Sequence, residues 1–207
     1  MSGRFISLEG GEGAGKSTQM KRLAEALRAR GKDVVETREP GGSAGAEAIR
    51  ALLLEGSGDR WTPRAEALLF AAARADHVAR TIRPALAEGR WVLSDRFLDS
   101  SLAYQGGADG IGTDAIRALH AIGSEALRPD RTLLLTLPAG EAAARAAARD
   151  RSGADRFGAR DAAYHARVAA AFLALAEAEP DRFRVIDAGG GPEQVTDRLI
   201  AAIGDFL

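Results

Sequence analysis

A glycine-rich stretch near the start of the chain, SLEGGEGAGKSTQ at residues 7–19, has the composition of a phosphate-binding loop. Gly10 is followed, after four residues, by Gly15, Lys16 and Ser17. Glycines at this spacing let backbone N–H groups close around phosphates, while a lysine reaches the β and γ oxygens and a serine binds Mg²⁺. The spacing predicts a nucleoside triphosphate site with contacts from Gly10, Gly13, Gly15, Lys16, Ser17 and Thr18.

Two further motifs place charged residues directly after short apolar runs. TREPGG at residues 37–42 contains Arg38, and SDRF at residues 94–97 contains Asp95 and Arg96. An arginine fork matches the geometry of phosphate, and a carboxylate at a strand end can reach Mg²⁺ or its waters. A surface arginine before a turn and a plain Asp-Arg ion pair are the alternative interpretations.

The elements that must position these residues alternate along the chain. After the glycine loop, Met20, Leu23, Ala24 and Leu27 recur at helical spacing. Short apolar runs predict strands at 4–9, 33–39, 91–95, 131–137 and 182–187, and helical patterns include 49–54 and 63–88. Strands that alternate with helices predict an α/β fold, a five-stranded parallel sheet with helices on both faces. Ligands of such sheets bind at the carboxyl ends of the strands, where the three motifs fall.

Composition excludes several other classes of protein. A chain of 207 residues that is 46% hydrophobic favours a single domain spanning 1–207. A net charge of −1 provides no general attraction to nucleic acid or an anionic membrane. The absence of Cys and the spacing of the three His argue against a zinc site. No apolar segment resembles a signal peptide or membrane span, so we expect a cytoplasmic protein.

Two features bear on the kind of nucleotide chemistry. A GTPase switch would normally read guanine through an Asn-Lys-x-Asp motif, and the sequence has no Asn. The polar, Arg-rich segment at 148–160 lies between two Ala-rich helical patterns and is the best candidate for a mobile lid.

The motifs taken together resemble the bacterial type of the thymidylate kinase family. The resemblance extends over nearly the whole chain, through FISLEGGEGAGKSTQ, TREPGG, LLFAAARADHV, SDRFLDSSLAYQG, the Arg-rich lid and VIDAGG. It implies a P-loop nucleoside monophosphate kinase-like fold, transfer of phosphate from ATP to dTMP with Mg²⁺, and a homodimer. It also implies that the turn at 187–190 packs on the donor adenine.

The same resemblance assigns roles to residues of the acceptor site. Arg38 and Arg96 would hold the acceptor phosphate, while Asp95 would bind the metal ion with Ser17. The remaining expected substrate contacts are Phe70 and Arg74 at the base, Tyr104 at the deoxyribose, Ser100, Ser101 and Gln105 near the base, and Glu12 near the 3′-hydroxyl.

Catalysis would rest on cations placed around the transferred phosphate. The acceptor phosphate has a second pKa of about 6, so it needs no general base at neutral pH. Some relatives carry a basic residue where this loop has Gly13, so we expect the lid to supply the missing cations. The expected catalytic residues are Lys16, Glu12, Arg96, Arg149 and Arg156.

The sequence departs from the family pattern in three places. Gly158 and Arg160 stand in the lid where acidic residues are frequent, and Thr136 stands where relatives often have Asp. Two other functions stay open: another nucleoside monophosphate or deoxynucleoside kinase, and a nucleotide-binding regulatory module without transfer activity.

Overall fold

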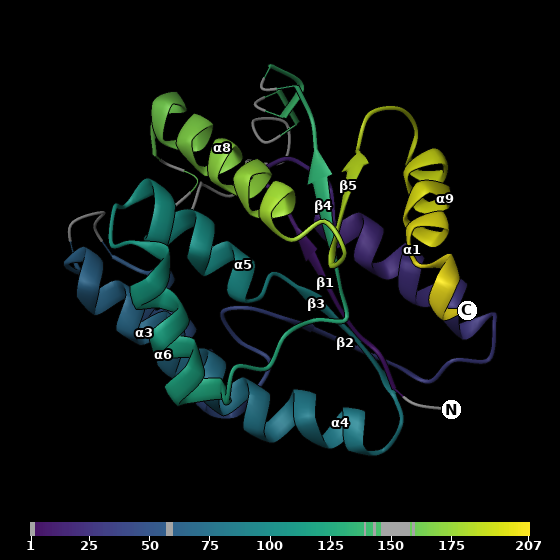
Figure 1. Cartoon of the computed structure of the whole chain (residues 1–207), viewed down its shortest axis with the longest axis horizontal. Helices are drawn as coiled ribbons and strands as arrows, with labels where there is room; N and C mark the ends of the chain where they lie inside the picture. Colours follow the sequence, from purple (N-terminus) through teal and green to yellow (C-terminus); the bar gives the residue numbers. More distant parts are fainter. Residues whose placement is uncertain (1–2, 57–59, 139, 143, 146–157, 159) are drawn as a thin grey trace.

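The computed structural model describes residues 3–56, 60–138, 140–142, 144–145, 158 and 160–207, which form a parallel sheet between two layers of helices (Figure 1). The sheet has five strands in the order β2-β3-β1-β4-β5. They are β1 (Phe5–Glu9), β2 (Val34–Arg38), β3 (Trp91–Asp95), β4 (Arg131–Thr136) and β5 (Phe183–Asp187). Each strand lies within the run that the sequence predicted, and the predicted sheet is confirmed.

Helices cover both faces of the sheet. Those described are α1 (Lys16–Arg28), α2 (Ala44–Leu54), α3 (Pro63–His77), η1 (Val78–Ile82), α4 (Arg83–Ala87), α5 (Leu98–Ser101), η2 (Leu102–Ala108), α6 (Thr113–Ser124), α8 (Ala162–Ala178), α9 (Pro192–Ala202) and η3 (Gly204–Phe206). In Figure 1, α1 and α9 lie on one face, while α3, α5, α6 and α8 lie on the other. In the described part of the chain, no helix is long and apolar enough to cross a membrane.

The alternation of side chains along each strand produces one core on each face. Phe5 of β1 belongs to the core beneath α3, α6 and α8, whereas Ile6 and Leu8 belong to the core beneath α1 and α9. In β4, Leu134 belongs to the first core and Leu133 to the second. Because both faces are covered, the central strands β1, β3 and β4 are largely apolar, whereas the edge strands β2 and β5 carry exposed polar residues as well. This explains why their positions could be predicted from composition alone.

Two helical predictions needed revision at their boundaries. The helix expected at 49–54 begins at Ala44, because the Ser43 hydroxyl caps it by accepting a hydrogen bond from the Ala46 N–H at 3.3 Å. The stretch expected as one helix at 63–88 consists of α3, the π-helical η1 and α4 in succession. Pro84 at the start of α4 lacks an N–H, so the regular hydrogen-bond ladder cannot continue through it.

The register of the central strands brings the predicted motifs together. Arg38 pairs with Asp95 across β2 and β3, and Leu8 pairs with Asp95 across β1 and β3. Parallel strands end at the same edge, so the loops after β1, β2 and β3 meet there. The phosphate-binding loop, TREPGG and SDRF therefore share one edge of the sheet.

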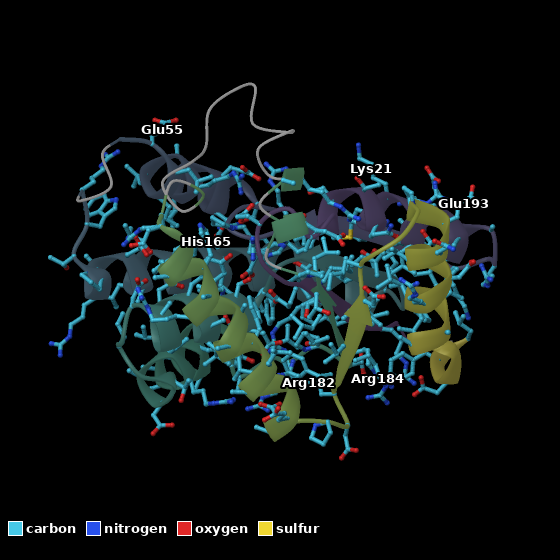
Figure 2. The ribbon with its side chains drawn as sticks, turned by 90° about the horizontal axis from the view of Figure 1, so that it is seen from above. Lys21, Glu55, His165, Arg182, Arg184 and Glu193 are labelled. Carbon is cyan, nitrogen blue, oxygen red and sulfur yellow. The ribbon has the colours of Figure 1, made fainter. Side chains whose placement is uncertain are left out.

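A buried ion pair fastens α5 to the segment between α8 and β5. Both guanidinium Nη atoms of Arg182 donate to the carboxylate of Asp99, at 2.6 and 2.8 Å. Thr132 also donates to Asp99, at 2.9 Å, and the Asp99 side chain is fully buried. Figure 2 labels Arg182 and Arg184 where α8 leads into β5.

Removal of Arg182 should therefore destabilise the fold, because Asp99 would remain as a buried unpaired charge. Arg182→Met should lower the free energy of unfolding by about 3–5 kcal/mol. The matched control Arg184→Met should cost less than about 1 kcal/mol, because Arg184 is part-exposed and donates its hydrogen bonds to backbone carbonyls rather than to a buried carboxylate. Urea denaturation of both variants would measure the two changes in the free energy of unfolding. Equal decreases would contradict the proposed contribution of the ion pair to stability.

Candidate active site

A cavity of about 230 Å³ opens at the edge of the sheet where β1, β2 and β3 end. It contains the predicted acceptor and metal residues together with part of the phosphate-binding loop. The predicted residues that line it are Glu12, Lys16, Ser17, Arg38, Phe70, Arg74, Asp95, Arg96, Ser100, Ser101, Tyr104 and Gln105. These residues come from four separate stretches of the chain, and their roles stay predictions.

A second cavity, of about 450 Å³, lies between the start of α1 and the segment that joins β5 to α9. Gly13, Gly15, Ser17 and Thr18 line it, as predicted for the donor site, and Ala188 and Gly190 face them. Ser17 lines both cavities. The two cavities therefore share the residue that is expected to bind the metal ion.

Glycines shape the phosphate-binding loop. Gly10 has φ of 136°, and a Cβ there would lie 2.4 Å from the carbonyl oxygen of Leu135. Gly15 has φ of 86° and immediately precedes α1, which begins at Lys16. The loop thus leads its backbone to the amino end of a helix, where unpaired N–H groups attract anions.

Lys16 lies against the inside of this loop. Its ammonium group donates to the carbonyl oxygens of Gly10, at 3.1 Å, and Gly11, at 2.9 Å. Burial lowers the pKa of Lys16 to about 8, and the nearby Arg96 guanidinium acts in the same direction. The charge of Lys16 is therefore sensitive to pH just above neutrality.

Ser17 and Asp95 bring two oxygen ligands together where the cavities meet. The Ser17 hydroxyl donates to Oδ2 of Asp95 at 3.0 Å, although the two residues are 78 positions apart in the sequence. A hydroxyl and a carboxylate are suitable ligands for Mg²⁺, which prefers oxygen. This chemistry fits the metal site predicted for these two residues.

Arg96 connects the phosphate-binding loop to the acceptor cavity. One Nη donates to the Gly10 carbonyl at 3.0 Å, and the other donates to Glu12 at 2.6 Å. Its guanidinium also lies over the ring of Tyr104, 5.2 Å from the centroid. Glu12 therefore contacts a part-buried cation inside the cavity.

Arg38 lies at the more exposed side of the same cavity. One Nη of Arg38 donates to both carboxylate oxygens of Glu47, at 3.0 and 3.1 Å. The Gly42 N–H, together with Arg38, holds the pKa of Glu47 below its usual value. Glu47 thus keeps Arg38 close to the turn that follows β2.

The far end of the cavity is formed by α3 and by the segment α5–η2. Arg74 donates to Glu39 at 2.7 Å and to Ser101 at 2.8 Å, and its side chain is only 4% exposed. Gln105 donates to Glu66 at 3.2 Å. These contacts hold the polar side chains in place beside Phe70, as a base pocket requires.

Sequence reasoning missed several residues that border the site. Glu39, Pro40, Arg50, Leu54 and Phe97 line the first cavity, and Arg145 lines the second. Arg145 donates to the carbonyl of Ala188 at 3.1 Å. The motif TREPGG offered a signal for Glu39 and Pro40, but an arginine in an Arg-rich chain offered none for Arg50.

Glu9 was also missed, although the sequence carried a signal for it. It is an acid at the end of an otherwise apolar strand, and it is fully buried. Burial raises the pKa of Glu9 to about 8, and the neighbouring Asp99 carboxylate adds to the shift. Its oxygens accept hydrogen bonds from the Phe97 N–H at 2.8 Å and the Ser100 hydroxyl at 2.6 Å.

Most of the expected lid lies outside the described residues. Arg149 and Arg156 are in that part, so their predicted roles stay predictions. Of the three departures from the family pattern, Arg160 stacks on the ring of Tyr164, 5.0 Å from its centroid. Thr136 donates to the Ile186 carbonyl at 3.3 Å.

Comparisons with known proteins agree on one family. The family model for thymidylate kinase matches residues 8–199. The thymidylate kinase of Rhizorhabdus wittichii is 68% identical over 207 residues, covering 100% of both chains. That of Caulobacter vibrioides is 53% identical over 207 residues, covering 99% of this chain and 96% of the relative. The chain belongs to the thymidylate kinase family.

A solved structure supports the same conclusion. The crystal structure of thymidylate kinase from Ehrlichia chaffeensis matches with a TM-score of 0.80 and 30% sequence identity, covering 98% of this chain and 100% of that one. The predicted family and the P-loop kinase-like fold are confirmed. The chain is an ATP-dependent phosphotransferase, and this disfavours a regulatory module without transfer activity.

The lowered pKa of Lys16 predicts how ATP affinity depends on pH. Below about pH 8 the ammonium group is charged and attracts phosphate, whereas above it the free enzyme must first take up a proton. From about pH 8 to pH 9.5, ATP affinity should fall by up to about tenfold per pH unit. Isothermal titration calorimetry would measure this dependence.

Lys16→Arg is the matched control, because an arginine stays charged throughout this range. Its ATP affinity should be nearly constant between about pH 8 and pH 9.5. A decline that persists in Lys16→Arg would assign the titration to another group, of which Glu9 is the first candidate.

Proposed function

We propose that this member of the thymidylate kinase family transfers the γ-phosphate of ATP to the phosphate of dTMP, giving ADP and dTDP. The observation that carries the proposal is the meeting of two cavities at Ser17. The donor cavity ends at the phosphate-binding loop, and the acceptor cavity begins there. A γ-phosphate held by the loop would therefore face an acceptor phosphate without crossing solvent.

The cations around this junction divide between the two substrates. Lys16 would exchange its loop carbonyls for the β and γ oxygens of ATP, while Arg38 and Arg96 would hold the acceptor phosphate. Ser17 and Asp95 would hold Mg²⁺, which supplies positive charge to the triphosphate when bound. Catalysis would then consist of positioning and charge stabilisation, with no general base.

The base end of the cavity would select the nucleoside. Phe70 would stack on thymine, Arg74 would donate to an exocyclic oxygen, and Ser101 and Gln105 would lie near the base. Tyr104 would exclude a ribose 2′-hydroxyl, because its ring is held by Phe172, with centroids 6.2 Å apart, and by Arg96. Glu12 would face the sugar 3′-hydroxyl from the opposite side.

Arg149 and Arg156 would complete the charge around the transferred phosphate. This part of the proposal rests on the family's lid and on the presence of Gly13, rather than a basic residue, in the phosphate-binding loop. Closure of such a lid would also exclude water and so suppress hydrolysis of ATP.

Measuring turnover with different phosphate acceptors tests the proposal directly. ADP formation from ATP and Mg²⁺ should be fast with dTMP, slower with dUMP, and near the no-acceptor rate with dCMP, dGMP, AMP or thymidine. Arg38→Met should raise the KM for dTMP by about tenfold or more without a similar change for ATP, because it removes a charged hydrogen bond to the acceptor phosphate.

Arg28→Met is the matched control, because Arg28 forms an exposed ion pair with Glu36 at the opposite end of α1. It should leave both KM values unchanged. Rapid turnover of thymidine or of another monophosphate would contradict the proposed acceptor pocket, and ATP loss without any acceptor would contradict transfer itself.

We also propose that the enzyme is a cytoplasmic homodimer that pairs through α3 and α6. These helices pack side by side (Figure 1). Leu68 on α3 is 57% exposed and Ile122 on α6 is 84% exposed. Exposed large apolar side chains on neighbouring helices are typical of a protein interface.

Ile122→Arg should convert the dimer to a monomer, because a charge at the centre of an apolar interface would be buried without a partner. Sedimentation equilibrium would distinguish one 21.7 kDa chain from two. Leu173→Arg on α8, where the leucine is 44% exposed, is the matched control and should leave the dimer intact. A wild-type monomer, or an Ile122→Arg dimer, would contradict the proposed interface.

A further inference from the structure

Glu9 is a buried acid at the centre of the active site whose role the phosphate-transfer mechanism leaves unexplained. It is the last residue of β1, directly before the phosphate-binding loop, and it is fully buried. A carboxyl group is costly to bury unless its oxygens are hydrogen-bonded. Both oxygens of Glu9 are hydrogen-bonded, and their partners are one and four positions after Arg96 in the sequence.

The first contact restrains the backbone that carries Arg96. The Phe97 N–H donates to Oε1 of Glu9 at 2.8 Å, and the Arg96 N–H donates to the Leu8 carbonyl at 3.0 Å. Between these two hydrogen bonds, Arg96 has φ of 72°. A non-glycine residue keeps this unfavourable conformation only when its surroundings hold it there.

The second contact restrains the guanidinium group. The Ser100 hydroxyl donates to Oε2 of Glu9 at 2.6 Å and accepts a hydrogen bond from Nη1 of Arg96 at 3.1 Å. The Ser100 oxygen thus lies between Glu9 and Arg96, where it accepts the hydrogen bond from the guanidinium group. Glu9 therefore restrains both the backbone at Arg96 and one of its side-chain acceptors, Ser100, while the Gly10 carbonyl and Glu12 hold the rest of the guanidinium group.

We propose that Glu9 is a positioning residue that aims Arg96 at the acceptor phosphate through the Phe97 amide and the Ser100 hydroxyl. The inference rests on the proposed role of Arg96 in holding that phosphate. It also changes the expected role of Ser100, which acts on the phosphate end through Arg96 rather than on the base.

A positioning role has a signature that a merely structural role lacks. Thymidine fills the base and sugar parts of the cavity but has no phosphate for Arg96 to hold. Loss of Arg96 positioning should weaken binding of dTMP and leave thymidine unaffected, whereas general damage to the cavity should weaken both. The quantity to measure is the ratio of dTMP affinity to thymidine affinity, by isothermal titration calorimetry on the intact enzyme.

Three variants test the two contacts. Glu9→Ala should lower the affinity ratio by roughly tenfold, because a small misplacement of a phosphate ligand is costly. Ser100→Ala keeps Glu9 and should lower the ratio by about threefold, through loss of one hydrogen bond to Arg96. Glu9→Gln keeps an acceptor for the Phe97 amide and a polar group at Ser100, so it should remain within about threefold of the wild-type ratio.

Two controls separate this inference from its alternatives. Arg96→Ala should lower the ratio at least as much as Glu9→Ala; if it does not, the proposed role of Arg96 itself fails. Glu179→Ala removes a carboxylate that lines neither cavity and is paired with Arg117, Arg128 and Arg182. It should lower the melting temperature and leave the ratio unchanged.

Several outcomes would overturn the inference while leaving the role of Arg96 intact. If Glu9→Ala and Glu179→Ala change the ratio equally, the cause is general destabilisation. If Glu9→Gln is as impaired as Glu9→Ala, the hydrogen bonds are not the cause. If Ser100→Ala weakens dTMP and thymidine equally, Ser100 belongs to the base pocket. Should Glu9→Ala fail to fold, the Ser100→Ala and Glu9→Gln results decide.

Discussion

The contact of Arg96 with the phosphate-binding loop joins the two halves of the active site. Its guanidinium donates to the Gly10 carbonyl and to Glu12, while its backbone continues into α5 and the wall of the acceptor cavity. A single side chain thus sets the distance between the place where a triphosphate would lie and the place where its acceptor would lie. Phosphoryl transfer depends on this distance more than on any acid or base, because the reaction requires in-line positioning.

A second constraint acts at this edge of the sheet: charged side chains that are buried there must lie next to groups that compensate their charge. Lys16, Arg96 and Arg74 are largely buried, and each lies close to acidic groups or carbonyl oxygens. Such pairing keeps the cations in place at a tolerable cost in desolvation. It also leaves them close enough to anions that phosphate oxygens can compete for them. Burial, together with the nearby Arg96 guanidinium, lowers the pKa of Lys16 at this edge.

The sequence predictions succeeded where a feature depends on neighbouring residues in the chain, and they failed where it depends on a particular side-chain contact. Strands such as β3, at Trp91–Asp95, were predicted to the residue because an apolar run in a doubly covered sheet is a local signal. The start of α2 was misplaced because it depends on the Ser43 cap rather than on apolar spacing. An acid at the end of a buried strand marked Glu9 as unusual, but its contacts could not be predicted because its partners, Phe97 and Ser100, are 88 and 91 positions away.

The sequence by itself determined the chemistry available to this protein: the phosphate-binding loop, the strand-end Asp95 and Arg96, and the order of strands and helices along the chain. These follow from residue types at short spacing, and they were sufficient to identify the thymidylate kinase family. Only the tertiary structure decided that β1 lies between β3 and β4, and therefore which loops meet. The physical reason is that strand order and buried charge pairs arise from contacts between distant segments, whose energies depend on the packing of the whole sheet.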